Sequence, residues 1–146
     1  MRVIQNADLF AGVGGTSTGM IRAFRRHGVH VNLLAVNHWD KAVQSHTINH
    51  PDVRHLCEEL EEVDPAVAVP GGRLNVLAGS PECTYHSRAR GGGVCDPQSR
   101  AGAWQVARWM EVTQPDYVVV ENVVEWMHWG PLTRKGRPDK RHKGKY

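Results

Sequence analysis

The chain has 146 residues, of which 40% are hydrophobic and 23% charged, as in an ordinary globular domain. It has no run of 18 apolar residues, and its N-terminus lacks the apolar core of a signal peptide, which argues against a membrane or secreted protein and favours a cytoplasmic one. The net charge of +3 is uneven, because residues 133–146 hold seven Lys/Arg against one Asp and the remainder is net acidic. This basic tail could be a solvated segment or could follow a phosphate backbone.

Strand-like and helix-like segments alternate from the N-terminus onwards. Residues 2–10 read as a strand that runs into a glycine-rich turn, and residues 16–28 have the apolar spacing of a helix that ends at a glycine. Residues 29–37 are mostly apolar, as in a strand buried on both faces. Residues 39–50 then predict a helix, which Pro51 closes.

The second half of the chain repeats this alternation. Residues 73–80 predict another buried strand, which ends in the loop Ser-Pro-Glu-Cys. Residues 96–114 carry apolar positions at helical spacing, and residues 116–123 form the clearest strand in the sequence. The pattern predicts an α/β fold with a mostly parallel sheet and right-handed crossovers. The loops after the strands then share one edge, where open α/β sheets bind ligands.

The cysteines and histidines do not form a recognisable metal or disulfide framework. The odd count of cysteines, without a C-x-x-C pair, argues against disulfides: Cys57, Cys83 and Cys95. His46 and His50 stand one helical turn apart, but no second pair of ligands follows in a zinc-site spacing. We therefore expect no metal site.

Three local features could carry chemistry, and each has a plain alternative. The turn at residues 12–15 suits a nucleotide-like cofactor, but Ser17 breaks the G-x-G-x-x-G spacing, so a structural turn remains open. Glu121 ends an apolar strand and could be a part-buried proton donor or an ordinary strand-end carboxylate. Cys83, alone in its loop, could serve packing, a disulfide, a metal or nucleophilic attack.

Taken in order, these features resemble the cytosine-5 DNA methyltransferase family. The matching motifs are Asp8-Leu9-Phe10-Ala11-Gly12-Val13-Gly14-Gly15, Pro81-Glu82-Cys83 and Glu121-Asn122-Val123. The resemblance covers nearly the whole chain. It implies the Rossmann-like S-adenosylmethionine-dependent methyltransferase fold, present as its N-terminal half, with a partial catalytic and cofactor-binding domain at 1–132 and a basic tail or linker at 133–146.

The resemblance also implies roles for the catalytic residues. Cys83 would attack carbon 6 of a cytosine flipped out of DNA, and Glu121 would hold the base through its N3 and exocyclic amine. Asn122 would support the loops around them, and Pro81 would rigidify the nucleophile loop. The methyl group of S-adenosylmethionine would then pass to carbon 5.

The cofactor contacts implied by the resemblance lie in four loops. The glycine-rich loop after the first strand supplies Asp8, Leu9, Phe10, Gly12, Gly14 and Gly15, and the loop before Cys83 supplies Ser80. In the loop after the second strand, His38 stands where the family commonly has an acidic ribose ligand, and Trp39 could stack on the adenine or belong to the core. In the acidic segment that follows, Glu59 would contact the adenine amine, and neighbouring Glu58 also fits.

The chain departs from the family after the Glu-Asn-Val motif. The family's Gln-x-Arg-x-Arg segment, its target-recognition domain and its closing elements are not in the sequence. This predicts a truncated enzyme or one partner of a split pair, inactive alone and dependent on a missing C-terminal half to act on DNA. Two alternatives stay open: a tRNA cytosine-5 methyltransferase of the same family, and a non-catalytic fragment that binds a partner or nucleic acid.

Overall fold

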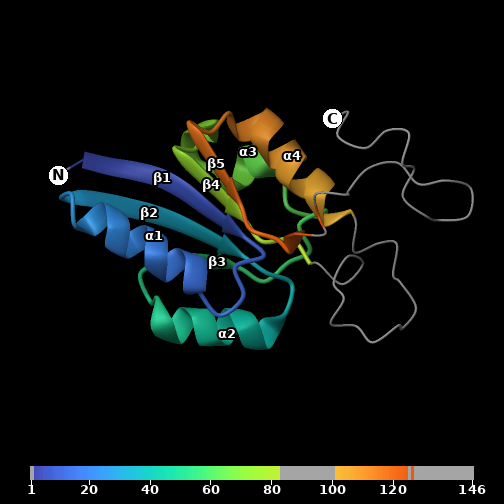
Figure 1. Ribbon diagram of the computed structural model, residues 1–146, viewed down its shortest axis with the longest axis horizontal. Coiled ribbons are helices and arrows are strands. Elements are labelled where there is room, and N and C mark those ends of the chain that lie inside the picture. The colour runs from blue at the N-terminus through green and yellow to red at the C-terminus, as the bar shows by residue number, and fades with distance from the viewer. Residues whose placement is uncertain (1, 83–100, 125, 127–146) are drawn as a thin grey trace, which may run out of the picture.

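The fold is built around one parallel sheet in a computed structural model that describes residues 2–82, 101–124 and 126. The strands stand in the order β3-β2-β1-β4-β5, and every neighbouring pair is parallel (Figure 1). The strand bounds are β1 (Arg2–Leu9), β2 (Val29–Val36), β3 (Arg54–Leu56), β4 (Val76–Gly79) and β5 (Tyr117–Val120). The helices are α1 (Gly15–Arg25), α2 (Asp40–Asn49), α3 (Pro65–Ala68) and α4 (Gly102–Thr113), with a 3-10 turn at Pro70–Gly72.

The helices cover the two faces of this sheet in pairs. The chain moves outward from β1 through β2 to β3, and then returns to the other side of β1 for β4 and β5. Crossovers of the same hand therefore place α1 and α2 on one face and α3 and α4 on the other (Figure 1). The strand order reverses between β1 and β4, which is the switch point where such sheets bind ligands.

The core lies mainly between the sheet and the α3–α4 layer. Trp109 of α4 is fully buried, and it packs in one cluster with side chains of β1, β2 and β4. The carboxyl halves of β1 and β2 are buried throughout, whereas their first residues are exposed or half-buried. The ends of the strands that carry the predicted motifs are thus the most firmly held parts of the sheet.

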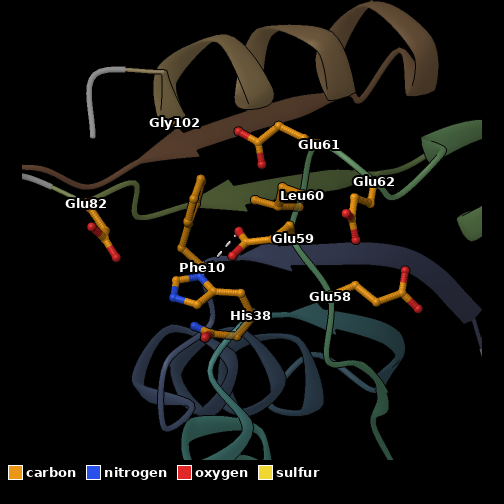
Figure 2. A pocket seen from close by; sticks show the side chains of 10 residues that line it. Phe10, His38, Glu58, Glu59, Leu60, Glu61, Glu62, Glu82 and Gly102 are labelled. Atoms are coloured by element: carbon orange, nitrogen blue, oxygen red, sulfur yellow. Dashed lines mark ion pairs between the residues drawn. The ribbon is translucent and has the colours of Figure 1, made fainter. Parts of the chain in front are cut away.

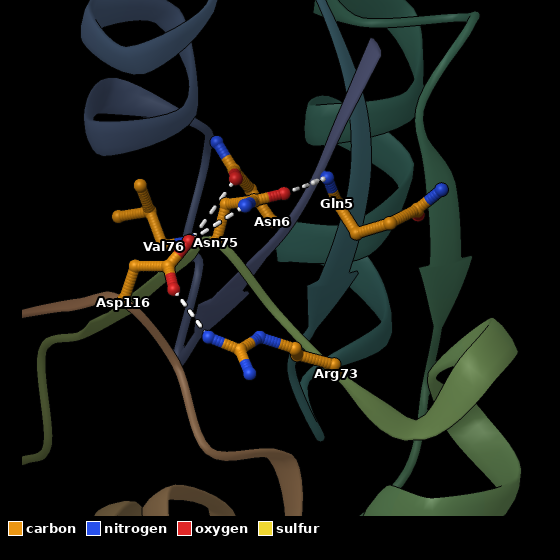
Figure 3. Close-up of polar contacts among 6 residues, drawn as sticks. All are labelled: Gln5, Asn6, Arg73, Asn75, Val76 and Asp116. Carbon is orange, nitrogen blue, oxygen red and sulfur yellow. Dashed lines mark hydrogen bonds and ion pairs between the residues drawn. The ribbon is translucent and has the colours of Figure 1, made fainter.

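Polar side chains join the strands at the opposite end of the sheet (Figure 3). The Asn75 amide oxygen accepts from the Gln5 backbone N–H at 3.0 Å, and its nitrogen donates to Asp116 at 2.7 Å. Arg73 also donates to Asp116 at 2.6 Å, and these hydrogen bonds hold the pKa of Asp116 below its ordinary value. Asn6 accepts from the first N–H of β4 at 3.1 Å. These bonds fix β4 and β5 in register against β1.

The observed elements confirm the sequence predictions except in the segment between α2 and β4. The predicted parallel α/β sheet is present, and the predicted strands and helices occur with shorter bounds; the strands predicted at 73–80 and 116–123 are the four-residue strands β4 and β5. The start of the helix predicted at 96–114 lies outside the described residues. Strand β3 and helix α3, which are only three and four residues long, were not predicted from the sequence. Within the described part of the chain, no helix is both long and apolar enough to cross a bilayer.

Candidate cofactor and active site

The loop after β1 adopts an unusual backbone shape at the switch point. Phe10 has a φ of 60°, a value rare for a residue with a side chain, and Gly12 and Gly14 have φ of 53° and 99°. The Ala11 N–H bonds the Val36 carbonyl at 3.1 Å, which ties the turn to the end of β2. The loop therefore turns sharply before α1 and projects the Phe10 side chain from the end of β1.

A pocket of about 420 Å³ opens beside this loop (Figure 2). Its lining residues are Phe10, Asn37, His38, Glu58, Glu59, Leu60, Glu61, Glu62, Glu82 and Gly102. Five of these ten residues carry carboxylates, and Phe10 stands between Glu82 and the acidic loop (58–62). The pocket therefore combines one aromatic wall with a strongly negative lining, which suits a cationic ligand that has a flat ring.

His38 and Glu59 face each other across this pocket. Their side chains approach to 3.8 Å between Nδ1 and Oε2, and both remain about half exposed. Because the pair is open to water, its contribution to stability is small. Both polar groups can therefore turn to a ligand at little cost.

One arginine of α4 fixes the acidic loop. The Arg108 guanidinium donates to the carbonyls of Leu60, of Glu61 at 3.4 Å and of Val63 at 2.9 Å. A single planar fork thus binds three carbonyls of a loop that has no helix or strand to pair them. Helix α4 consequently sets the position of the wall that carries Glu59.

Asp8 lies beneath the glycine turn and is fully buried. Its Oδ2 accepts from the Ser17 hydroxyl at 2.6 Å, while Oδ1 has no hydrogen-bond partner among the described residues. Burial disfavours the charged form and raises the pKa of Asp8 to about 6. Such an unsatisfied buried oxygen is costly and marks a place where a polar partner is missing.

The loops after β4 and β5 are tied to each other. The Asn122 amide donates to the Pro81 carbonyl at 2.9 Å, and the Glu121 N–H bonds the end of β4 at 3.1 Å. Pro81 is buried. A Cβ added to Gly102 would meet Pro81 at 2.9 Å and Phe10 at 3.3 Å, so the start of α4 packs closely against both loops. The predicted motif residues of three strands therefore meet at one edge.

Of the two alternatives for Glu121, the structure favours the exposed strand-end carboxylate over the part-buried one, and it leaves the nucleophile loop untested. Glu121 is exposed, because β5 is the outermost strand of the described sheet and nothing described covers its far side. Trp39 is 56% exposed, so the alternative of a core tryptophan is wrong. Leu9 lies in the core and not at the pocket. Cys83 lies outside the described residues, whereas Cys57 is an exposed free thiol.

Of the predicted cofactor residues, only some line the pocket. Phe10, His38 and Glu59 come together there, and Glu58 lies beside them. The turn glycines and Ser80 border the same sheet edge without lining this pocket. Asn37, Glu82 and Gly102 line the pocket without having been predicted as cofactor contacts, although Asn37 precedes His38 and Glu82 stands within the motif Pro81-Glu82-Cys83. Among the described residues, no group of three His, Cys, Asp or Glu side chains could hold a metal ion.

A parallel sheet with a glycine-rich turn at its switch point and loops of three strands meeting beside it is typical of the Rossmann-like class of α/β folds. The family described as C-5 cytosine-specific DNA methylase matches residues 4–129, and the chain belongs to that family. The chain is 30% identical over 131 residues to the Type II methyltransferase M.AgeI of Thalassovita gelatinovora, covering 83% of this chain and 28% of that protein.

Two further comparisons agree with this assignment. M.DdeI of Desulfomicrobium norvegicum is 28% identical over 118 residues, covering 80% of this chain and 27% of that protein. A crystal structure described as a DNA modification methyltransferase encoded within an E. coli prophage superposes with a TM-score of 0.68 at 24% identity, over 97% of this chain and 35% of that one, which supports the fold. The chain thus spans less than a third of the curated relatives that it matches.

Proposed function

We propose that this chain supplies the cofactor-binding and nucleophile-bearing part of a DNA (cytosine-5)-methyltransferase that uses S-adenosylmethionine. The observation that carries the proposal is the acidic, Phe10-walled pocket at the switch point of a sheet that belongs to this family. S-adenosylmethionine combines a positive sulfonium and amine with a flat adenine. The carboxylates of the pocket suit the positive groups, and the Phe10 ring suits the adenine. When bound, it supplies an electrophilic methyl group.

We assign the cofactor contacts by their place in the pocket. Phe10 packs against the adenosine, and Glu59 and His38 accept or donate hydrogen bonds to its amine and hydroxyl groups. Asp8 does not line the pocket and is fully buried; through its bond to Ser17 it supports the turn of residues 12–15 from beneath. Trp39, exposed beside this edge, is free to stack on the ring system.

The chemistry that we propose needs a nucleophile because carbon 5 of cytosine is a weak one. The Cys83 thiolate forms a bond to carbon 6 while Glu121 supplies a proton at N3; the double bond between carbons 5 and 6 is lost, and an enamine with its double bond between carbons 4 and 5 forms. Carbon 5 then takes the methyl group, and S-adenosylhomocysteine is the leaving group. Loss of the carbon 5 proton to a base restores the double bond between carbons 5 and 6 and breaks the bond to Cys83, while N3 returns its proton to Glu121 and the thiolate is regenerated.

The loop contacts support roles for the neighbouring residues. Because Asn122 bonds the Pro81 carbonyl at 2.9 Å, it joins the Glu121 strand to the segment that leads to Cys83. Buried Pro81 restricts that segment further. The exposure of Glu121 leaves its carboxyl group open to a base that has been flipped out of a duplex.

DNA recognition, on this proposal, belongs to sequence outside this chain, in the same polypeptide or in a second one. The support is that the chain aligns with only 28% of M.AgeI and 27% of M.DdeI. Two other functions would be revealed by the covalent-trapping experiment. One is methylation of a cytosine in tRNA, and the other is a non-catalytic fragment that binds a partner or nucleic acid.

Calorimetric titration with S-adenosylhomocysteine tests the pocket directly. We expect Glu59→Gln to weaken binding by about tenfold, since a lost charge-assisted hydrogen bond is worth roughly 1.5 kcal/mol or more. Glu111→Gln, an equally exposed change on the far end of α4, should leave the dissociation constant unchanged. Equal affinities for all three proteins would place the cofactor elsewhere.

Covalent trapping tests the nucleophile and the substrate. The chain is co-expressed with a recognition part of the M.AgeI type and mixed with S-adenosylmethionine and 5-fluorocytosine DNA. The fluorine blocks the final elimination, so a denaturant-stable adduct should form. We expect Cys83→Ala to abolish the adduct and Cys57→Ala, at the exposed free thiol, to retain it. An adduct on 5-fluorocytosine RNA alone would favour the tRNA enzyme. An absence of any adduct when a recognition part of the M.AgeI type is co-expressed would favour the non-catalytic fragment.

A further inference from the structure

A histidine cluster lies directly behind the glycine turn. His46 and His50 come from α2 and its C-terminal end and His55 from β3, with the His46 ring 4.9 Å from His50 and 4.8 Å from His55 between centroids. His46 is only 1% exposed. Three of the five buried polar residues in the described part of the chain, namely Asp8, Ser17 and His46, belong to this one network. Polar groups are costly to bury, so such a concentration beneath a binding loop calls for a role.

The donors and acceptors of the first branch run in one direction. The ionised Asp8 carboxylate can only accept, so the Ser17 hydroxyl donates to it at 2.6 Å and has lone pairs left. These accept from the His46 Nε2–H at 3.0 Å, which leaves His46 Nδ1 as an acceptor for the His55 Nε2–H at 2.8 Å. The branch is therefore satisfied when His46 is neutral with its proton on Nε2.

The second branch holds the turn itself. The His50 Nε2–H lies 2.9 Å from the Thr18 hydroxyl and 3.3 Å from the Gly14 carbonyl, and Thr18 donates to that same carbonyl at 2.8 Å. A Cβ at Gly14 would come within 2.8 Å of His50 and 3.1 Å of His46, so both rings press against this residue. Gly14 precedes α1 as its N-cap but has no side chain to bond the helix end. Besides the backbone bonds of the turn itself, from the Gly14 N–H to Ala11 and from the Thr18 N–H to Gly14, the turn is therefore also held from outside, by α2.

We propose that His46 and His50 are positioning residues for the cofactor, which hold the turn of residues 12–15 and the Asp8 carboxylate in their binding arrangement. This inference rests on the proposed cofactor site, and it makes cofactor affinity depend on helix α2. His46 acts through Ser17 on Asp8, and His50 acts through Thr18 on Gly14. Neither residue is among those that line the acidic pocket.

The first test compares affinities for S-adenosylhomocysteine in the full chain. His50→Leu removes the donor and should raise the dissociation constant about tenfold, while His50→Gln keeps an N–H group and should stay within roughly threefold of wild type. Thr18→Val removes the hydroxyl that joins His50 to the Gly14 carbonyl, while the backbone N–H of residue 18 still bonds that carbonyl at 2.9 Å, and it should act like His50→Leu. This second variant keeps the test decisive if the His50→Leu protein fails to fold. His27→Leu, at an exposed histidine, is the matched control.

The outcomes separate this inference from the function on which it rests. If the wild type does not bind S-adenosylhomocysteine, the proposed cofactor site itself is wrong. If the wild type binds and both His50→Leu and Thr18→Val bind within about twofold of it, the cofactor site stands and the positioning role is overturned. A purely structural role would lower the melting temperature of His50→Gln as well and would show no rescue of affinity.

A second readout needs no cofactor. Nitrogen-15 NMR of the histidine rings at neutral pH should show His46 as the tautomer protonated on Nε2, and Ser17→Ala should shift that signal because its acceptor is removed. An Nδ1-protonated His46 in the wild type would reverse the direction of the first branch and would overturn its part in the proposal.

Discussion

The buried Asp8 carboxylate provides a quantitative test of the site, through the substitution Asp8→Asn. The pKa of Asp8 is raised to about 6 from an ordinary value of 3.8, because burial disfavours its charged form. Between these two pH values the unfolded carboxyl group has lost its proton while the folded one retains it. Stability therefore falls as the pH rises from about 4 to about 6, and the loss persists above pH 6.

The magnitude follows from the size of the shift. One pKa unit corresponds to about 1.4 kcal/mol, so a shift of about two units costs roughly 3 kcal/mol at neutral pH. Asparagine has the same shape, can still accept from Ser17 and does not titrate. The free energy of unfolding of Asp8→Asn relative to wild type should therefore increase by about 3 kcal/mol between about pH 4 and about pH 7.

Urea unfolding at a series of pH values, followed by tryptophan fluorescence, to which buried Trp109 contributes, and by circular dichroism, measures this difference. His46 titrates in the opposite sense, since burial and the neighbouring His55 and His50 lower its pKa to about 4, but it is present in both proteins and cancels. Asp52→Asn, at an exposed carboxylate, controls for removal of a charge. Parallel pH profiles for wild type and Asp8→Asn would refute the argument that Asp8 is buried at a cost.

Three further changes have expected effects. Gly14→Ala should destabilise the chain by about 2 kcal/mol or more in thermal unfolding, because φ at this residue is 99° and the new Cβ would meet His50 at 2.8 Å. Gly15→Ala is the control: a Cβ there has nothing within 4 Å, so this change should be nearly neutral. Arg108→Met should lower the free energy of unfolding in urea by about 3 kcal/mol, since three carbonyls of the pocket wall lose their donor. It should also weaken S-adenosylhomocysteine binding in calorimetry. An unchanged affinity would show that the pocket wall holds its shape without Arg108. Asn75→Ala should cost about 1–2 kcal/mol but leave cofactor affinity intact, because it acts at the opposite end of the sheet.

The sequence predicted the sheet well because its strands obey strong local rules. Buried parallel strands are continuous apolar runs, and the helices between them show helical spacing and glycine or proline ends. The missed segment follows weaker rules. Strand β3 has only three residues, Arg54–Leu56, too few for a period to show. Helix α3 did carry a signal, since Asp64 caps it at 2.9 Å and Pro65 begins it, but four residues have little helical pattern.

The sequence predicted only some of the residues that form the pocket, because part of its wall is held by contacts to the backbone. Phe10, His38 and Glu59 sit in motifs whose residue types carry the information. Arg108 does not, because its partners are backbone carbonyls some 45 to 48 residues earlier, and a carbonyl has no residue type for a sequence to reveal. The sequence left open whether Glu121 is part-buried or exposed, because the apolar content of a strand does not say whether that strand is central or outermost in the sheet.

The histidines of α2 illustrate how one spacing supports different chemistry. Two histidines one helical turn apart face the same side of a helix. This arrangement occurs in metal sites, but the sequence has no second pair of ligands to complete one. The structure uses the same geometry to aim both rings at one glycine, with His46 reaching Ser17 and His50 reaching Thr18. Since a glycine at φ of 99° has no side chain with which to fix itself, the loop requires an external partner, and polar rings supply directional bonds that an aliphatic residue could not. On this view, buried Asp8 and the histidine network belong to one arrangement. Burying Asp8 lowers the stability of the chain, and in return the loop of residues 12–15 keeps a defined shape for its ligand.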